Sequence, residues 1–338
     1  MRFQDKLLLG LIGGGAALWA TRAYLRSRRQ FSLRDKVVVV TGASSGLGLI
    51  VARMAAEQGA KLAIAARDAD ALDDAAGELH KAGATGVFAI PTDVSDRGQA
   101  EALIARTVEH YGRIDVLVNN AGTMIVGPHD TLTVEDYERV MATNFWGEVY
   151  PTLAAIPHMR RQGSGRIANV ISVGGRVAIP HMLPYSASKF ALTGFSEGLR
   201  PELVKDNIYL TAVYPGTIRT GAHPHVEVKG DHEAEYSWFA LSDTIPGLAT
   251  SAESCARSLW HAVLHGDPEV IVGLNARMAI GFHNLFPEWN LEVQALVDRV
   301  LPRSPGGPSP SVRGSDIRGK VPDLVNRMIP AGTRPNPA

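Results

Sequence analysis

The chain has little of what marks several common classes of protein. It contains one cysteine, Cys255, in 338 residues, which excludes an intrachain disulfide and a cysteine-based zinc cluster. Its 34 basic and 34 acidic residues cancel, and no long Lys/Arg run occurs in the central region, so we expect no nucleic-acid partner. The sequence also shows no internal repeat. Cys255 falls within a predicted amphipathic helix over residues 252–265, where we expect a buried structural thiol.

Residues 1–30 predict an N-terminal hydrophobic helix, with an uncharged stretch, LLLGLIGGGAALWAT, between Lys6 and Arg22. As a helix it would span about 22 Å, short of a hydrocarbon core of about 30 Å. A signal peptide, a membrane anchor and an amphipathic helix on a protein or bilayer surface are the alternatives. Without a small-x-small cleavage site the anchor is favoured, and the arginines after it place the domain that follows on the cytoplasmic side. The alternative location is the cytoplasm, without a membrane anchor.

The region over residues 31–273 predicts one catalytic domain of the Rossmann type. Short β-branched runs alternate with longer segments of helical period, as in βαβ units, so we predict an α/β fold with a doubly wound, seven-stranded parallel sheet and helices on both faces. The predicted strands cover residues 37–40, 61–66, 86–90, 116–118, 166–172, 209–214 and 269–272.

Two further segments follow the predicted catalytic domain. Residues 274–301, rich in Met, Phe, Leu and Trp, predict an apolar helical extension. Residues 302–338 form a Pro/Gly-rich tail whose composition predicts that it is largely disordered. Within the tail, the apolar residues between Val321 and Ile329 have the spacing of a short docking helix.

The first predicted strand runs directly into a glycine-rich turn, Thr41 to Gly48, and then into a helix-forming run. Gly42 permits a tight turn, Gly46 lets backbone N–H groups approach a pyrophosphate, and Gly48 lets the helix lie against the strand. The helix N-terminus then faces an anion. The spacing differs from G-x-G-x-x-G and lacks the ending of an ATP-binding P-loop, so this turn alone could also be purely structural.

A second motif, Tyr185-Ser186-Ala187-Ser188-Lys189, places a phenol and an ammonium four residues apart. Both lie on one face of the helix predicted over residues 184–203. A free tyrosine titrates near 10, so acid/base work near neutrality requires about 4 kcal/mol of preference for the phenolate, and a nearby ammonium supplies the required sign of charge. Ser172, at the carboxyl end of a predicted strand, can hydrogen-bond a carbonyl oxygen.

Together these motifs resemble the single-domain form of the short-chain dehydrogenase/reductase family over about residues 33–272. The resemblance is carried, in order, by the turn over residues 41–48, Asp93 in Thr-Asp-Val, Asn119-Asn120-Ala121-Gly122, Asn144, Ser172, Tyr185 with Lys189, and Pro215-Gly216 followed by Thr220. It implies that Tyr185 is the general acid/base, Lys189 assists it and holds the nicotinamide ribose, Ser172 orients the substrate oxygen and Asn144 positions a relay water. Homodimers and homotetramers are also implied.

The same resemblance implies a set of cofactor contacts. Asp93 meets the adenine, Asn120 lines the cleft and Pro215 to Thr217 cover the nicotinamide, although turn formation also explains Asp93 and Asn120. The complete predicted set is Gly42, Ser44, Ser45, Gly46, Leu47, Gly48, Arg67, Asp93, Val94, Asn120, Ala121, Gly122, Tyr185, Lys189, Pro215, Gly216, Thr217 and Thr220.

The end of the second predicted strand, Ala65-Ala66-Arg67, indicates the cofactor. An acidic residue here would bind the ribose 2′-hydroxyl, whereas an arginine accommodates a 2′-phosphate. With Arg67 present and Ser44 as a second phosphate contact, we predict NADP(H), and NAD(H) as the alternative because Asp68 is adjacent.

The sequence therefore predicts an NADP(H)-dependent oxidoreductase that interconverts a carbonyl and an alcohol. The segment between Gly216 and Thr250 contains His223, His225 and several aromatic residues, typical of a substrate loop, and predicts a lipophilic small-molecule substrate. The two histidines lack further ligands at fitting spacing, so no metal is expected. The alternative function is a catalytically silent, membrane-tethered nicotinamide sensor or scaffold. Pro151 predicts a kink or restart in the helix that carries Asn144.

Overall fold

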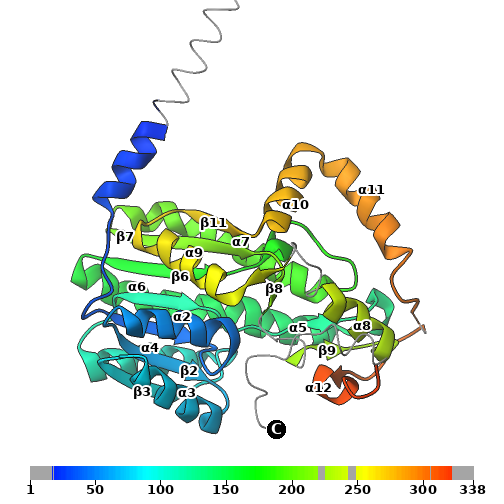
Figure 1. Ribbon diagram of the computed structural model, residues 1–338, viewed down its shortest axis with the longest axis horizontal. Coiled ribbons are helices and arrows are strands. Elements are labelled where there is room, and N and C mark those ends of the chain that lie inside the picture. The colour runs from blue at the N-terminus through cyan, green and yellow to red at the C-terminus, as the bar shows by residue number, and fades with distance from the viewer. Residues whose placement is uncertain (1–16, 18, 220–224, 243–248, 305, 322–338) are drawn as a thin grey trace, which may run out of the picture.

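The computed structural model describes residues 17, 19–219, 225–242, 249–304 and 306–321 (Figure 1). Its centre is a parallel sheet of seven strands in the order β11-β7-β6-β4-β1-β2-β3. The predicted doubly wound sheet is therefore confirmed. The strands are β1 (Val37–Thr41), β2 (Lys61–Ala66), β3 (Gly86–Pro91), β4 (Val116–Asn119), β6 (Gly165–Val170), β7 (Ile208–Pro215) and β11 (Glu269–Val272).

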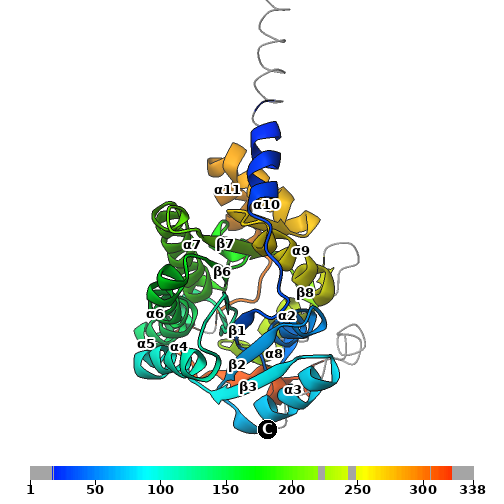
Figure 2. The same ribbon diagram turned by 90° about the vertical axis from the view of Figure 1, so that its left-hand side faces the viewer.

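Helices cover both faces of the sheet, as the edge-on view in Figure 2 shows. One layer contains α2 (Gly46–Glu57), α3 (Ala69–Lys81) and α9 (Ala252–Leu264). The other contains α4 (Arg97–Tyr111), α5 (Val134–Met141), α6 (Gly147–Gln162) and α7 (Leu183–Val204). Cys255 of α9 is buried, as expected, and burial raises the pKa of its thiol to about 12.

The strands read as continuous apolar runs because both faces of the sheet are buried. In β1, Val38 and Val40 join the core beneath α2 and α9, whereas Val39 joins the core on the opposite face. The alternation of side chains in an extended strand produces this division. The chain thus builds two hydrophobic layers on one sheet.

The helix that carries Asn144 differs from its prediction. It is not broken at Pro151, since α6 runs through both Pro151 and Pro157. The irregular part lies earlier, in a π-helical turn, η2 (Ala142–Trp146), between α5 and α6. A prolyl ring crowds the carbonyl four residues before it, here that of Gly147, and the wider π turn directly precedes that residue. The local distortion therefore falls at Asn144.

A second, smaller layer forms beyond the main sheet. Here β9 (Glu227–Val228) pairs with β5 (Ile125–Val126) and β12 (Val312–Arg313), next to α8 (His232–Ser242) and α12 (Gly314–Ile317). Part of the tail expected to be disordered is thus structured, because Val312, Ile317 and Val321 pack into an apolar cluster around Val228. Apart from Val321, the docking helix expected over residues 321–329 lies outside the described residues.

The remaining elements are the N-terminal helix, two helices after β11, and several short strands and turns. Residues 19–28 are helical, and α10 (Leu274–Leu285) and α11 (Pro287–Asp298) follow β11. Two short strands, β8 (Ile218–Arg219) and β10 (Thr250–Ser251), pair with each other, and η1 (His129–Thr131) and η3 (Val173–Gly175) are single 3-10 turns. Within the described part of the chain, no helix combines the length and apolarity needed to cross a bilayer. Most of the uncharged N-terminal stretch lies outside that part.

Candidate active site

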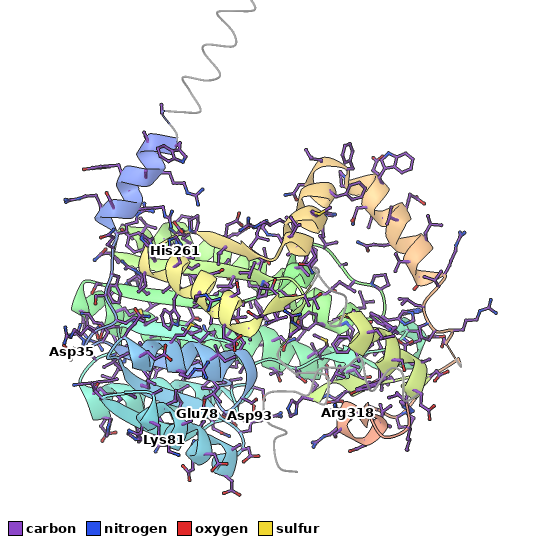
Figure 3. All side chains as sticks on the ribbon, viewed as in Figure 1. Asp35, Glu78, Lys81, Asp93, His261 and Arg318 are labelled. Atoms are coloured by element: carbon purple, nitrogen blue, oxygen red, sulfur yellow. The ribbon has the colours of Figure 1, made fainter. Side chains whose placement is uncertain are left out.

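The carboxyl ends of the parallel strands meet at one edge of the sheet, where open α/β folds bind ligands. Asp35, just before β1, and Asp93, just after β3, lie at opposite ends of the strands in Figure 3. The predicted site residues follow β1, β2, β3, β4, β6 and β7. The topology therefore brings residues far apart in sequence to one edge.

The glycine turn joins β1 to α2 with almost no free space. Gly42 and Gly46 have φ values of +64° and +54°, in the left-handed region that favours glycine. A Cβ at Gly48 would lie 2.1 Å from the Gly42 carbonyl oxygen, so only glycine fits there. At Ser45, the N-cap of α2, no side chain caps the helix, and its first turn contains no acidic residue. These N–H groups can therefore donate to an anionic ligand.

Asn120 ties this turn to the end of β4. Its Nδ2 donates to the carbonyl oxygens of Thr41 and Gly42 at 3.1 and 3.2 Å. In return, the Thr41 hydroxyl oxygen accepts from the backbone N–H groups of Asn120 and Ala121, at 3.0 and 3.1 Å. The amide that sequence reasoning placed in the cofactor cleft thus also sets the shape of the turn. Gly122 lies nearby, where an added Cβ would be 3.4 Å from Asn144 Oδ1.

Arg67 and Asp68 have different environments at the end of β2. Arg67 is exposed directly after the strand. Asp68 is the N-cap of α3, and its Oδ1 accepts from the Ala71 N–H at 2.9 Å. The Asp68 carboxylate is thereby engaged in a helix cap, which satisfies one of the otherwise free first-turn donors.

Asp93 forms a turn after β3. Its Oδ1 accepts from the Ser95 backbone N–H at 3.0 Å and from the Ser95 hydroxyl at 2.7 Å. The neighbouring Val94 is buried, and a Cβ at Gly147 would lie 2.8 Å from its Cγ2. The loop that carries both predicted contacts is therefore held close to the start of α6.

Ser172 and Tyr185 come together around Gly174. Ser172 lies two residues beyond β6, not within it as the sequence predicted, and its Oγ accepts from the Gly174 N–H at 3.0 Å. A Cβ at Gly174 would lie 3.1 Å from Tyr185 Cε1 and 3.5 Å from Ser172 Oγ. The hydroxyl and the phenol ring are thus neighbours at the start of α7.

Lys189 lies one turn along α7 from Tyr185 and is buried. Its Nζ donates to the Val170 carbonyl oxygen and to Glu148 Oε1, both at 2.9 Å. Sequence reasoning missed Glu148, which lies four residues after Asn144. Burial raises the pKa of the Glu148 carboxyl to about 7, against the opposing effect of Lys189. A buried ion pair therefore lies next to the predicted acid/base.

Asn144 connects the π turn to two other parts of the site. Its Oδ1 accepts from the Thr123 N–H at 2.7 Å, and its Nδ2 donates to the Thr123 carbonyl at 2.9 Å and to Ser188 Oγ at 3.1 Å. Ser188 directly precedes Lys189. The position of Asn144 thus links the loop after β4 with the helix that carries Tyr185.

The segment after β7 passes close to α10. A Cβ at Gly216 would lie 2.4 Å from Asn275 Oδ1, and Asn275 Nδ2 donates to Thr217 Oγ1 at 3.3 Å. Pro215 pairs with Val272 at the end of the sheet. Like Glu148, Asn275 was not predicted from the sequence, although it contacts the predicted site residues Gly216 and Thr217. Thr220 and His223 lie outside the described residues.

A cavity of about 800 Å³ opens beside this edge of the sheet. Its walls come from three segments distant in sequence, residues 127–130, 178–183 and 294–304. Leu183, in the cavity wall, lies two residues before Tyr185. The Nδ1 of the buried His181 is hydrogen-bonded to Glu235 Oε1 at 2.8 Å. The lining mixes apolar and polar groups, as small-molecule pockets do.

The chain is similar to known proteins over most of this region. A family model described as short chain dehydrogenase matches residues 36–229. An uncharacterised oxidoreductase of Bacillus subtilis, YxnA, is 34% identical over 273 residues, which cover 80% of this chain and 72% of that one. An Arabidopsis thaliana protein named 11-beta-hydroxysteroid dehydrogenase-like 3 is 38% identical and covers 72% of this chain and 75% of its own length.

A solved structure supports the same relationship. A short-chain dehydrogenase from Streptomyces avermitilis superposes with a TM-score of 0.69 at 29% identity, and the match covers 80% of this chain and 99% of that one. The similarity therefore extends from sequence to the arrangement of the sheet and its helices.

Proposed function

The chain belongs to the short-chain dehydrogenase/reductase family, whose members are NAD(P)-dependent oxidoreductases, and we propose that it interconverts a carbonyl and an alcohol with Tyr185 as general acid/base. The observation that carries this proposal is the grouping of Tyr185, Ser172 and Lys189 at one sheet edge, around Gly174 and the end of β6. The nicotinamide would supply or accept the hydride when bound. The residues of this chain would handle the proton.

In carbonyl reduction, the Tyr185 hydroxyl donates its proton to the oxygen that becomes the alcohol, and in oxidation the phenolate takes that proton back. Ser172 Oγ, next to the same ring, donates a hydrogen bond to this oxygen as negative charge develops on it. Lys189 provides the positive charge that favours the phenolate. Asn144, bonded to Ser188, positions the water of the proton relay.

We propose NADP(H) as the preferred cofactor. The glycine turn fits a pyrophosphate, because the uncapped N-terminus of α2 leaves its N–H groups free to donate and Gly48 excludes any side chain. Arg67 is exposed directly after β2 and, with Ser44 in the turn, would hold the 2′-phosphate. Asp68, the acidic residue next to Arg67, uses its Oδ1 to cap α3.

The substrate we propose is a lipophilic small molecule bound in the cavity beside Leu183. Ile179 and Pro180 line this cavity, and Ile179, like Trp238 and Phe239, packs against the apolar cluster around Val228. The similarity to proteins named hydroxysteroid dehydrogenase-like agrees with this substrate class. We further propose that the uncharged stretch before Arg22 attaches the protein to a membrane, with the catalytic domain on the cytoplasmic side.

A carbonyl and alcohol panel with NADPH or NADP⁺ tests the main proposal. We expect at least one lipophilic substrate to be turned over, and we expect Tyr185→Phe to lose about 100-fold or more in kcat while it still binds NADPH. Full turnover by the Phe variant would refute the role of Tyr185. NADPH binding with no turnover of any compound, by either protein, would instead favour the silent sensor or scaffold.

A further inference from the structure

The outer faces of α10 and α11 are unusually apolar for a surface. Leu291 is 61% exposed on the opposite side of α11. Six other large apolar side chains of α10, α11 and the turn after α11 are each at least 58% exposed: Leu274, Met278, Leu285, Trp289, Leu296 and Val300. Their spacing places those of each helix on one face. Contiguous apolar patches of this kind normally mark an interaction surface. We call these six residues the α10–α11 apolar face.

This face lies on the same side of the molecule as the N-terminal helix. Both views show residues 19–28 and the α10–α11 pair projecting from the body in the same general direction (Figures 1 and 2). The helix base is fixed, since Arg26 Nε lies 2.9 Å from Asp267 Oδ1 and its Nη2 lies 3.4 Å from His261, which Figure 3 labels on α9. In the sequence, the uncharged stretch of residues 7–21 runs directly into this helix, and its residues 19–21 belong to it.

We propose that the α10–α11 apolar face rests on a lipid bilayer. The exposed Arg22 and Arg28 on the N-terminal helix and Arg277 on α10 provide cations for anionic headgroups, while apolar side chains enter the acyl boundary. The apolar face lies on the same side as the helix over residues 19–28, and an uncharged stretch precedes that helix in the sequence, so a membrane surface matches better than a flat protein partner does. α11 also contributes Gln294 and Asp298 to the cavity wall, so docking places this cavity beside the bilayer.

Lipid quenching of Trp289 tests this docking in the full chain. We expect vesicles of phosphatidylcholine and phosphatidylserine with brominated acyl chains to quench a fluorescence component that Trp289→Phe lacks. We also expect Met278→Ser/Trp289→Ser/Leu296→Ser to weaken vesicle binding by about tenfold or more. Val134→Ser, which changes an exposed apolar residue on α5, should leave binding unchanged.

Three outcomes would overturn the bilayer as the occupant. One is no quenching of Trp289 by brominated lipid. Another is unchanged vesicle binding by the triple variant. The third is a concentration-dependent dimer, detected by light scattering without lipid, that the triple variant dissociates, since this would assign the face to a second copy. Should the triple variant not fold, the quenching comparison with Trp289→Phe decides by itself.

An independent observation concerns Glu148, a carboxylate with no exposed surface beneath Lys189. Its Oε1 accepts from Lys189, but its Oε2 has no hydrogen-bond partner among the described residues. The polar side chains around the pair are neutral: Asn119 from β4, Thr152 from α6, Asn169 from β6, and Asn144 and Ser188 from the relay. Of the described groups, Lys189 is the one charged neighbour that acts on the Glu148 carboxyl.

We infer that Glu148 is a positioning residue that sets, through Lys189, the charge acting on Tyr185. This inference rests on the proposed role of Tyr185. An ammonium alone favours the phenolate, whereas an ammonium paired with a carboxylate acts more weakly because the two charges partly cancel. Glu148→Gln leaves the ammonium uncompensated, so the phenolate should form at lower pH. The acidic limb of alcohol oxidation should move in the same direction.

A spectroscopic titration tests this inference without a substrate. The difference in phenolate absorbance between each protein and its Tyr185→Phe counterpart isolates the Tyr185 signal. We expect Glu148→Gln to lower the midpoint pH by about one unit, Glu148→Asp to restore it, and Asp115→Asn to leave it unchanged. Asp115 is a matched control, because it is also buried but lies at the opposite end of β4.

A failure of the inference about Glu148 can be distinguished from a failure of the role proposed for Tyr185. An unmoved or raised midpoint in Glu148→Gln overturns the role of Glu148 and leaves that of Tyr185 standing. Full turnover by Tyr185→Phe instead refutes the proposed role of Tyr185, on which this inference rests. Should Glu148→Gln not fold, Glu148→Met has similar length and no charge, and the same prediction applies to it.

Discussion

The region around β1, β2, β4 and the glycine turn, which we call the cofactor half, differs from the region around β5, β9 and the cavity, which we call the substrate side. The two regions are stabilised by different interactions. In the cofactor half, β1 pairs with β2 over five positions and with β4 over three, and the glycine turn leaves no room for a side chain at Gly48. On the substrate side, β9 pairs over only two positions with each of its neighbours. Polar and charged side chains join the substrate side instead, as in Lys229 with Asp136 and His181 with Glu235.

This difference determines what each region reveals. Where the backbone sets the geometry, few residue types are tolerated, so a motif such as the glycine turn has a restricted meaning. Where side chains from distant segments meet, many combinations build a similar cavity, and the sequence pattern does not specify its ligand. Four changes test this contrast, from the largest expected effect to the smallest.

The largest effect should come from Gly48→Ala. The new Cβ would lie 2.1 Å from the Gly42 carbonyl oxygen and 2.5 Å from Asn120 Nδ2, so the backbone of the turn must move. We expect a loss of about 3 kcal/mol or more in unfolding free energy, together with loss of NADPH binding. Urea denaturation and NADPH fluorescence measure the two. Gly77→Ala, on an exposed part of α3 with nothing within 4 Å, should instead stabilise by up to about 1 kcal/mol. Equal stability of the two variants would contradict this reasoning.

On the substrate side, Lys229→Met should cost about 2 kcal/mol at pH 7, because it leaves the buried Asp136 carboxylate with only the partly exposed Arg139. Burial raises the pKa of Asp136, but the Lys229 hydrogen bond and the Thr133 N–H outweigh it, so the net pKa is lowered. The ion pair therefore stabilises the fold above the ordinary Asp pKa, and this stability is lost as pH falls through the lowered value.

Denaturation of the wild type and Lys229→Met at pH 7 and near pH 3 measures this dependence. The difference between the two proteins should shrink in acid, and Lys229→Met/Asp136→Asn should recover most of the stability at pH 7. A difference that is the same at both pH values would mean that the charge of Asp136 does not matter.

The sequence predicts the sheet well because both faces of each strand are buried. The runs at β2 and β11 match the predicted ranges, and the spacing of Tyr185 and Lys189 identifies one helix face. It does not predict contacts between separate elements. Glu148 reaches Lys189 across 41 residues, and Lys229 reaches Asp136 across 93. An acidic residue four positions after Asn144, on a helix with an apolar inner face, was the available signal for Glu148.

Local irregularities were also beyond the sequence pattern. Pro151 suggested a break at its own position, but the π turn before Gly147 absorbs the distortion. Ser172 was predicted to end a strand over residues 166–172, whereas β6 ends at Val170 and Ser172 caps the following 3-10 turn. Both differences arise from hydrogen bonds that periodicity does not encode.

Arg67→Ala should have a smaller, selective effect in the cofactor half. Removing a cation from the 2′-phosphate position should weaken NADPH binding by about tenfold, or about 1.4 kcal/mol, and change NADH binding little. Asp68→Asn keeps the cap on α3 and serves as the control, since an asparagine oxygen also accepts from the Ala71 N–H. Fluorescence titration with both cofactors measures the ratio. Equal losses for NADPH and NADH would exclude a 2′-phosphate contact at Arg67.

The smallest effect should come from the substrate side, from Leu183→Ala. Leu183 lines the cavity and is 44% exposed, so truncation removes apolar contact area for a ligand without opening a hole in the core. We expect the KM of a lipophilic substrate to rise by about threefold, or about 0.7 kcal/mol, with NADPH affinity unchanged. Val134→Ala, on α5 and outside the cavity lining, should change neither. A threefold change that appears in kcat rather than KM would indicate that Leu183 positions Tyr185, two residues further along α7, rather than the substrate.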